Sequence, residues 1–238
     1  MRDTEHHLFY SRGIAEDTVM LDESETVHAV SVLRIKEGQR IQVTDGSGTV
    51  FECECTERLK KTISCKILGR QKIPKTNPRL TLLIGIPDKE PFETVLEHAT
   101  ALSVSRIIPL VMDHCRKPWW ESWDKMLPRF TSKMIVSMKQ CLYPYIPQLD
   151  KPARLSEIID SCSKPLIAAD QHGEVLRHDI LASQTQICCL VGPPGGFSEE
   201  EKKLLELHKA LTVKIAPHRL RTELAAAVLC SQVMVAVS

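Results

Sequence analysis

Apolar and polar positions follow two different patterns along the chain, and the pattern changes near residue 74. Before that point, Gln39–Val43, Thr49–Cys55 and Thr62–Leu68 alternate apolar and polar residues, which is typical of strands with one buried face. Asp45–Gly48 separates the first two runs, and an Asp-Gly step between alternating runs is a strong hairpin signal. Residues 1–73 are therefore predicted to form a small β-barrel.

The second pattern begins after a Pro-containing segment, residues 74–78, which we interpret as a linker. Continuous apolar runs are predicted as strands at 80–86, 106–112, 165–169, 186–191 and 212–216, and helical patterns at 92–102, 123–141, 198–210 and 221–235. Alternating buried strands and helices favour a mostly parallel sheet covered on both faces. Residues 79–238 are therefore predicted to form one α/β domain.

Composition adds little to this picture and removes some functions. Of the 238 residues, 43% are apolar and 26% charged, and the net charge of +1 neither supports nor excludes a nucleic-acid partner. The polar opening Met1–Glu5 is unlike a secretory signal, and the apolar runs are too short to span a membrane. With nine cysteines, an odd number, we expect a reduced, cytoplasmic protein.

Zinc is the one metal that the cysteines suggest. Cys53 and Cys55 share one face of a predicted strand, and Cys65 follows ten residues after Cys55. Nearby residues supply no second pair of cysteines or histidines to complete four ligands. We therefore interpret these three, and Cys188-Cys189, as small buried side chains, and predict no metal site.

One candidate for chemistry is the loop after the strand at 186–191. Gly192-Pro193-Pro194-Gly195-Gly196 leads into Ser198-x-x-Glu201, the capping-box pattern of a helix start. Glycines allow close backbone approach and prolines fix the shape, at the strand end where parallel sheets bind ligands. The loop lacks the P-loop lysine and the dinucleotide fingerprint. A nucleoside-like ligand held by backbone groups and a tight turn without ligand both stay open.

A second candidate is the segment Ile215–Ala227. Arg219, Arg221 and Glu223 lie just before or at the start of an apolar helix. Arginines beside an apolar helix suggest contacts with an anion or a base, since burying an unpaired arginine is costly. The alternative is a solvated helix start at which Glu223 complements the helix dipole.

Together these segments resemble the ribosomal RNA small-subunit methyltransferase E family of the SPOUT superfamily. Cys189–Glu201 is similar to its motif L-L-x-G-P-E-G-G-F-S-x-x-E, and Ile215–Ala225 to L-G-x-R-I-L-R-x-E-T-A. His28–Gly38 is similar to the family's N-terminal H-x-x-x-V-L-R-x-x-x-G. The chain departs from the family where Pro194 replaces a glutamate and His218 replaces an arginine.

The resemblance implies a fold and an activity. It implies a PUA-like barrel that grips RNA and a C-terminal domain whose last elements form a trefoil knot. Family members are homodimers that use S-adenosylmethionine, and no metal, to methylate N3 of the uridine at position 1498 of 16S rRNA. The implied partners are therefore 16S rRNA or the small ribosomal subunit and a second copy of the chain, without a membrane.

The resemblance also implies roles for individual residues. Arg221 is expected to stabilise the uracil anion, and Glu223 to accept the N3 proton or to fix Arg221. The residues expected to hold the cofactor are Leu190, Gly192, Gly195, Gly196, Ile215, Leu220 and Ala225. Those expected to contact RNA phosphates are Arg34, Lys36, Arg116 and Lys117. Trp119, Trp120 and Trp123 either stack on bases or pack in the core or at a dimer interface, and we favour packing.

Three other functions compete with this one. A related SPOUT enzyme would act on a ribose 2′-hydroxyl or on another base, which the N-terminal barrel and Arg219–Glu223 argue against. A non-catalytic RNA-binding assembly factor would keep the fold without the cofactor, and Pro194 and His218 give this alternative some support. A nucleotide hydrolase would need phosphate and Mg²⁺ ligands that the sequence lacks at the required spacing.

Overall fold

The computed structural model describes residues 7–116, 118–163, 165–181 and 183–237, and the chain divides into two compact units. Unit 1 takes the chain up to Lys75 together with Ile135–Ile146. Unit 2 takes Thr76–Met134 and the chain from Pro147 onward. Each unit is described by itself below.

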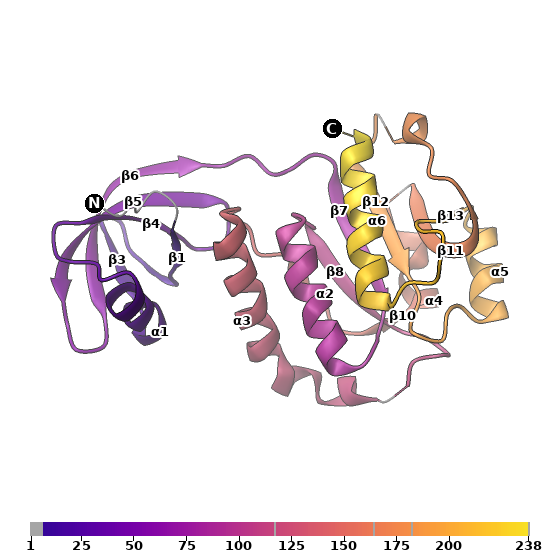
Figure 1. The fold of residues 1–238 in the computed structure, drawn as a ribbon, viewed down its shortest axis with the longest axis horizontal. Coiled ribbons are helices and arrows are strands. Elements are labelled where there is room, and N and C mark those ends of the chain that lie inside the picture. The colour runs from indigo at the N-terminus through magenta and orange to yellow at the C-terminus, as the bar shows by residue number, and fades with distance from the viewer. Residues whose placement is uncertain (1–6, 117, 164, 182, 238) are drawn as a thin grey trace. The chain divides into compact units, whose positions relative to one another are not determined.

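Unit 1 is built on a six-stranded sheet in the order β1-β4-β5-β6-β3-β2, which curls around its core (Figure 1). Its strands are β1 (Leu8–Tyr10), β2 (Gly13–Ile14), β3 (Thr18–Leu21), β4 (Arg40–Thr44), β5 (Thr49–Arg58) and β6 (Ile63–Lys72). β4 and β5 pair antiparallel across the Asp45–Gly48 turn, which confirms the predicted hairpin. β5 also pairs antiparallel with β6. Alternate residues of these strands, such as Ile41, Val43 and Cys53, fill the core.

A short helix interrupts the strands of unit 1. α1 (Glu23–Val27) continues into a π-helical turn, η2 (His28–Val32), inside the region predicted to be β-rich. Asp22 caps α1, because its side chain accepts a hydrogen bond from the Glu25 amide at 2.9 Å. The Asp22-x-x-Glu25 spacing is thus a helix-start signal, and it lies between residues that also suit strands.

The segment after α3 (Trp123–Cys141) completes unit 1. Tyr145 bridges to Ser47, and its hydroxyl donates to the Ile73 carbonyl at 2.6 Å. A Cβ at Gly48, where φ is +99°, would lie 1.9 Å from the Tyr145 ring, and one at Gly46 would lie 2.5 Å from Ile146. These glycines therefore make room for a segment about a hundred residues away, besides turning the hairpin.

Unit 2 contains a seven-stranded sheet in the order β10-β8-β7-β12-β11-β13, with β9 also paired to β8. Its strands are β7 (Arg79–Gly85), β8 (Arg106–Val111), β9 (Gln148–Leu149), β10 (Ala153–Arg154), β11 (Leu166–Glu174), β12 (Gln186–Val191) and β13 (Leu211–Val213). Every pair in this sheet is parallel, which confirms the predicted α/β class. A parallel sheet collects the carboxyl ends of its strands along one edge, where ligands bind.

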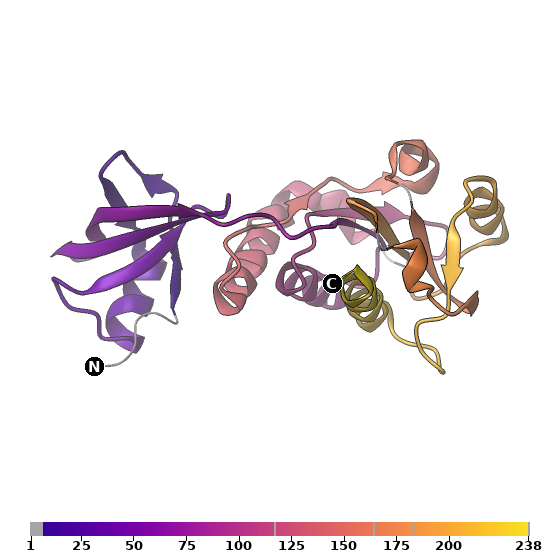
Figure 2. The ribbon, with the colours of Figure 1, turned by 90° about the horizontal axis from the view of Figure 1, so that it is seen from above.

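Helices cover both faces of this sheet (Figure 2). They are α2 (Lys89–Ala101), α3 (Trp123–Cys141), α4 (Leu155–Ile158), α5 (Glu199–Leu207) and α6 (Thr222–Val237), with 3-10 turns η3 (Trp119–Ser122), η4 (Ile159–Ser161) and η5 (His178–Ile180). α6 packs against α2, β7 and β12. On the opposite face, Leu155 and Ile159 around α4 and Leu205 of α5 join the core formed by alternate strand residues such as Leu83 and Leu190.

α2 and the first part of α3 are joined by aromatic and ionic contacts. The Phe92 ring lies 5.2 Å from that of Phe130 and 5.8 Å from that of Trp123, which is only 5% exposed. The indole N–H of Trp119 donates to the Pro87 carbonyl at 2.9 Å. Trp119 and Trp123 therefore pack inside unit 2, whereas Trp120 is half-buried and its ring lies 6.3 Å from that of Trp119.

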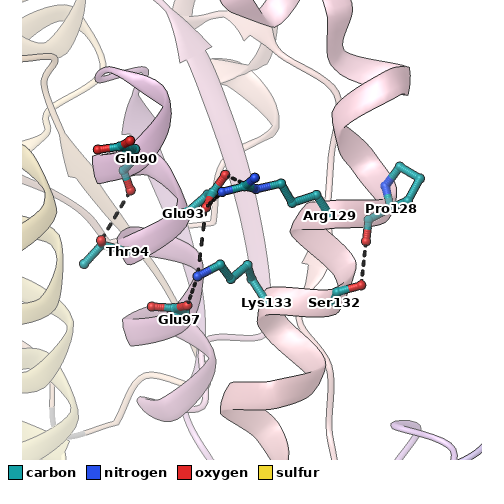
Figure 3. A network of polar contacts seen from close by, with 8 residues as sticks. All are labelled: Glu90, Glu93, Thr94, Glu97, Pro128, Arg129, Ser132 and Lys133. Atoms are coloured by element: carbon teal, nitrogen blue, oxygen red, sulfur yellow. Dashed lines mark hydrogen bonds and ion pairs between the residues drawn. The ribbon is translucent and has the colours of Figure 1, made fainter. Parts of the chain in front are cut away.

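Ion pairs reinforce the same pair of helices (Figure 3). Arg129 of α3 pairs with the buried Glu93 of α2 at 2.6 Å, and Lys133 pairs with Glu97 at 2.7 Å. The two carboxylates lie one helical turn apart, so successive turns of α3 contact successive turns of α2.

The five cysteines considered as metal ligands or core residues lie buried in the two units. Cys53, Cys55 and Cys65 are at most 3% exposed in the unit 1 core, and Cys188 and Cys189 are buried in β12. Among the described residues, no cluster of three or more His, Cys, Asp or Glu side chains is placed to hold a metal ion. None of the helices in the described ranges is long and apolar enough to cross a membrane.

Candidate active site

A cavity of about 870 Å³ opens in unit 2 at the carboxyl ends of the parallel strands. One wall is the loop Gly192–Phe197 between β12 and α5, which we call the Gly-Pro loop. A second wall is Ile215–Ala225, which leads from β13 into α6, apart from Pro217 and Leu224. The two segments that the sequence singled out therefore border one cavity.

The Gly-Pro loop has a fixed shape. The Gly196 N–H donates to the Pro193 carbonyl at 2.8 Å, which closes a four-residue turn over Pro193–Gly196. Gly196 has φ +81°, in the left-handed region that glycine adopts without strain, and a Cβ there would meet no atom within 4 Å. At Ser198 and Glu201 the predicted capping box is confirmed, because each side chain accepts the other's backbone N–H.

Three hydrogen bonds connect the two walls of the cavity to each other or to α6. Arg219 donates to the Pro194 carbonyl at 2.5 Å, and the Thr222 hydroxyl donates to the Gly192 carbonyl at 3.4 Å. The Gln232 amide of α6 donates to the Ile215 carbonyl at 3.0 Å. The shape of each wall therefore depends on the other, although they are separated by α5 and β13 in the sequence.

The structure brings together most of the residues predicted to hold a cofactor. Those that line the cavity are Gly192, Gly195, Gly196, Ile215, Leu220 and Ala225. Leu190 is fully buried within β12 and packs in the sheet core, while its neighbour Val191 lines the cavity. This placement follows from strand alternation, since Leu190 and Val191 point to opposite faces.

The predicted catalytic pair also faces this cavity. Arg221 and Glu223 both belong to its lining, at the start of α6. Arg221 is exposed, Glu223 is half-buried, and within the described ranges neither side chain has an ion pair or hydrogen bond. Both charges are thus available to a ligand in the cavity.

The predicted RNA-binding residues fall into different parts of the chain. Arg34, which has φ +57°, and Lys36 are exposed in unit 1. Arg116 lines the cavity of unit 2 and lies 3.9 Å from the carboxylate of Asp88. Lys117 lies outside the described residues.

Sequence reasoning missed two parts of the cavity wall. Ala169–His172 comes from the far part of β11, which runs five residues beyond the predicted strand end, and Pro87, Asp88 and Pro91 precede or begin α2. A usable signal existed, since both segments follow a buried strand of a parallel sheet. Asp88, Asp170 and His172 add titratable groups to the wall.

Comparison with known proteins agrees with this geometry. Residues 74–234 match the family described as RNA methyltransferase domain, and residues 21–68 match the RNA methyltransferase PUA domain. The chain is 27% identical to ribosomal RNA small subunit methyltransferase E of Aquifex aeolicus, over 96% of this chain and 99% of that protein.

Solved structures resemble the whole chain. A Legionella pneumophila protein solved with its bound cofactor S-adenosylmethionine has a TM-score of 0.86 and 25% identity, with 97% of each chain covered. Ribosomal RNA small subunit methyltransferase E of Neisseria gonorrhoeae, also solved with S-adenosylmethionine, shows the same fold with a TM-score of 0.85, 22% identity and coverage of 97% and 98%. With its family match over most of unit 2 and its similarity to rRNA methyltransferases from end to end, this chain belongs to the RNA methyltransferase domain family.

Proposed function

We propose that this protein transfers a methyl group from S-adenosylmethionine to N3 of a uridine in 16S rRNA, the family position 1498. The observation that carries the proposal is the single cavity bordered by both the Gly-Pro loop and the segment with Arg221 and Glu223. A cofactor loop and a charged pair are the two parts that such a transfer needs. The relatives named above support rRNA as the substrate class.

The cavity fits S-adenosylmethionine in size and in chemistry. Its volume of about 870 Å³ lies within the range of about 300–1,000 Å³ typical of small-molecule sites. Glycine backbone borders open space at Gly196, and Val191, Ile215 and Ala225 offer apolar contacts to an adenosine. Asp88 and Arg116, which also line the cavity, carry charges that suit the polar end of the cofactor.

The chemistry asks little of the protein beyond position and charge. S-adenosylmethionine supplies an activated methyl group on its sulfonium, so the base needs only in-line placement and loss of its N3 proton. Arg221, which has no ionic partner among the described residues, stabilises the negative charge that develops on the uracil. Glu223, two residues further on and half-buried, either accepts the N3 proton or fixes Arg221.

RNA affinity comes from phosphate contacts, for which Arg34 and Lys36 of unit 1 and Arg116, in the cavity lining of unit 2, are exposed. Further parts of the proposal are a homodimer, a cytoplasmic site of action and a trefoil knot in the C-terminal elements. The hydrogen bonds from Arg219 and Thr222 to the Gly-Pro loop support close entanglement of these elements. Light scattering after size exclusion tests the dimer, and a crystallographic chain trace tests the knot.

The test of the activity uses purified protein, 16S rRNA or small subunits lacking the modification, and S-adenosylmethionine with a labelled methyl group. N3 lies on the pairing edge of uracil, so its methylation stops reverse transcriptase and primer extension locates the product. We expect one strong stop, dependent on the cofactor. Arg221→Ala is expected to reduce kcat by about 10²-fold or more, as for loss of one stabilising donor.

Arg79→Ala is the matched control, because Arg79 is an exposed arginine at the opposite end of β7 from the cavity. It is expected to leave the rate unchanged. Label on a ribose or on another base would replace the proposed substrate by that of a related enzyme. A folded protein that binds RNA but not S-adenosylmethionine would instead be an assembly factor, and the methyltransferase proposal would be abandoned.

A further inference from the structure

The loop that follows β8, Met112–Arg116, contacts the start of α5. The Ser198 hydroxyl donates to the Asp113 carboxylate at 2.6 Å, and the Asp113 N–H donates to Glu201 Oε1 at 3.0 Å. Both α5 residues are buried, Ser198 being 8% and Glu201 9% exposed. The capping box of α5 is therefore joined to a loop 85 residues earlier in the chain.

The next residue of the β8 loop contacts the Gly-Pro loop directly. His114 Nδ1 lies 3.0 Å from the Gly196 carbonyl oxygen, so the imidazole donates there when Nδ1 carries the proton. A Cβ on Gly195 would fall 2.5 Å from the His114 Cβ. His114 thus forms a hydrogen bond with the loop and packs against Gly195, where a side chain would collide with it.

These contacts reach across a strand. β8 and β12 are not neighbours in the sheet, because β7 lies between them. The Gly-Pro loop lies over the end of β7, where a Cβ on Gly85 would be 2.3 Å from the Pro193 nitrogen. Gly85 at the end of β7 therefore packs against Pro193, and the β8 loop contacts Gly195 and Gly196 at the other end of the Gly-Pro loop.

A capping box does not need these additional bonds. Ser198 and Glu201 already satisfy the first amides of α5 through each other. The Ser198 hydroxyl donates to the Asp113 carboxylate, and the second Glu201 oxygen accepts from the Asp113 backbone N–H. Because Ser198 is buried, loss of the Asp113 side chain leaves its hydroxyl unsatisfied. Among the described residues that line the cavity, neither Asp113 nor His114 appears, so these bonds shape the loop without touching what the cavity holds.

We propose that Asp113 and His114 are positioning residues that hold the Gly-Pro loop in the conformation that binds S-adenosylmethionine. The inference rests on the proposed function of the cavity. Because the two residues act through Gly196, Ser198 and Glu201, their loss weakens cofactor binding and leaves the methyl-transfer step intact.

The test is calorimetric titration with S-adenosylmethionine, together with kcat and KM for methyl transfer. We expect His114→Ala and Asp113→Ala each to raise Kd for the cofactor about fivefold, as loss of one loop-fixing side-chain hydrogen bond, because the backbone N–H of residue 113 still donates to Glu201 in the alanine variant. KM for the cofactor rises in parallel, and kcat at saturating cofactor stays within about twofold of the wild type.

Conservative variants separate positioning from mere folding. In His114→Asn the side-chain amide nitrogen takes the place of the ring Nδ1, and Asp113→Asn keeps an acceptor for the Ser198 hydroxyl, so both should recover most of the affinity. The control is His98→Ala, an exposed histidine in the last turn of α2 that lies outside these contacts. Thermal unfolding of every variant checks the fold.

Each outcome decides something. If the wild type binds the cofactor and His114→Ala and Asp113→Ala bind it equally well, the positioning role is wrong and the proposed function stands. If affinity falls but the asparagine variants do not recover it, the hydrogen bonds are not its cause and the inference is again overturned. A folded wild type that does not bind S-adenosylmethionine overturns the proposed function and this inference together.

Discussion

Replacing Gly85 by alanine tests whether the end of β7 supports the Gly-Pro loop. A Cβ there would lie 2.3 Å from the Pro193 nitrogen, 2.5 Å from its ring Cδ and 2.8 Å from the Gly192 carbonyl carbon. Ordinary contacts of this kind are 3.4–4 Å, so at least one atom must move by roughly 1 Å. Two of the three obstacles are backbone atoms, which cannot rotate away as a side chain can.

The size of the effect on stability and on cofactor affinity depends on whether the loop stays in place or moves. Overpacking of a buried site costs about 1–3 kcal/mol, and a backbone obstacle favours the upper end of that range. If the loop stays in place, about 3 kcal/mol appears as lost stability, or a fall in Tm of about 6–12 °C. If the loop moves instead, stability is largely kept and the Kd for S-adenosylmethionine rises about tenfold or more.

The assay therefore measures both quantities on Gly85→Ala, thermal unfolding and calorimetric titration with the cofactor. Gly69→Ala is the matched control, since Gly69 is also a strand glycine and its Cβ would meet only the Glu52 carboxylate at 3.9 Å. Alanine there should be neutral or stabilising by a few tenths of a kcal/mol. If Gly85→Ala matches Gly69→Ala in both measurements, the reasoning about loop support is refuted.

Three further predictions concern unit 1. Arg34→Ala and Lys36→Ala should each weaken RNA binding and reduce the slope of log K against log salt by about 0.7–0.9, and an unchanged slope in filter binding would argue against phosphate contact. Burial raises the pKa of the Cys53 thiol from 9.0 to about 12. The free energy of unfolding, measured with urea, should therefore be constant up to pH 9.0 and decline between pH 9.0 and about 12, and this decline should be smaller in Cys53→Ala. Lys139→Met leaves the 5% exposed carboxylate of Glu25 without its cation and should lower the free energy of unfolding by about 3 kcal/mol. The double variant Lys139→Met, Glu25→Leu should recover most of this stability, as measured by calorimetric unfolding.

Features set by neighbouring residues were predictable from the sequence. The capping box of Ser198 and Glu201, the β4–β5 hairpin at Asp45–Gly48 and the alternation of strands and helices after the linker all depend on contacts within a few residues. Helix α3 has the predicted bounds for the same reason, because its apolar positions repeat with the helical period. Local rules failed at α1, where a helix-start signal lies among strand-forming residues, and they missed the short elements β9, β10 and α4.

Features that depend on distant residues were not predictable. The sequence assigns Gly46 and Gly48 to a turn, but it does not show that Tyr145 and Ile146 occupy the space these glycines leave. Likewise Asp113 reads as an ordinary polar residue after a strand, and only the fold brings it to Ser198. Such pairings are fixed by the order of strands in the sheet, which periodicity does not determine.

The departures from the family motif are compatible with an intact site when their contacts are considered. Pro194 lacks the carboxylate of the motif's glutamate, yet its backbone carbonyl still accepts a hydrogen bond, from Arg219 at 2.5 Å. A carbonyl is present whatever the side chain, so this connection between the two walls does not require a glutamate. Proline at this position also restricts the loop, which lowers the entropy lost when the loop is ordered. His218 leaves the connection unaffected, because the neighbouring Arg219 makes it. The Gly-Pro loop is therefore held by its backbone acceptors and by donors from other elements, and these contacts do not depend on a glutamate at position 194 or an arginine at position 218.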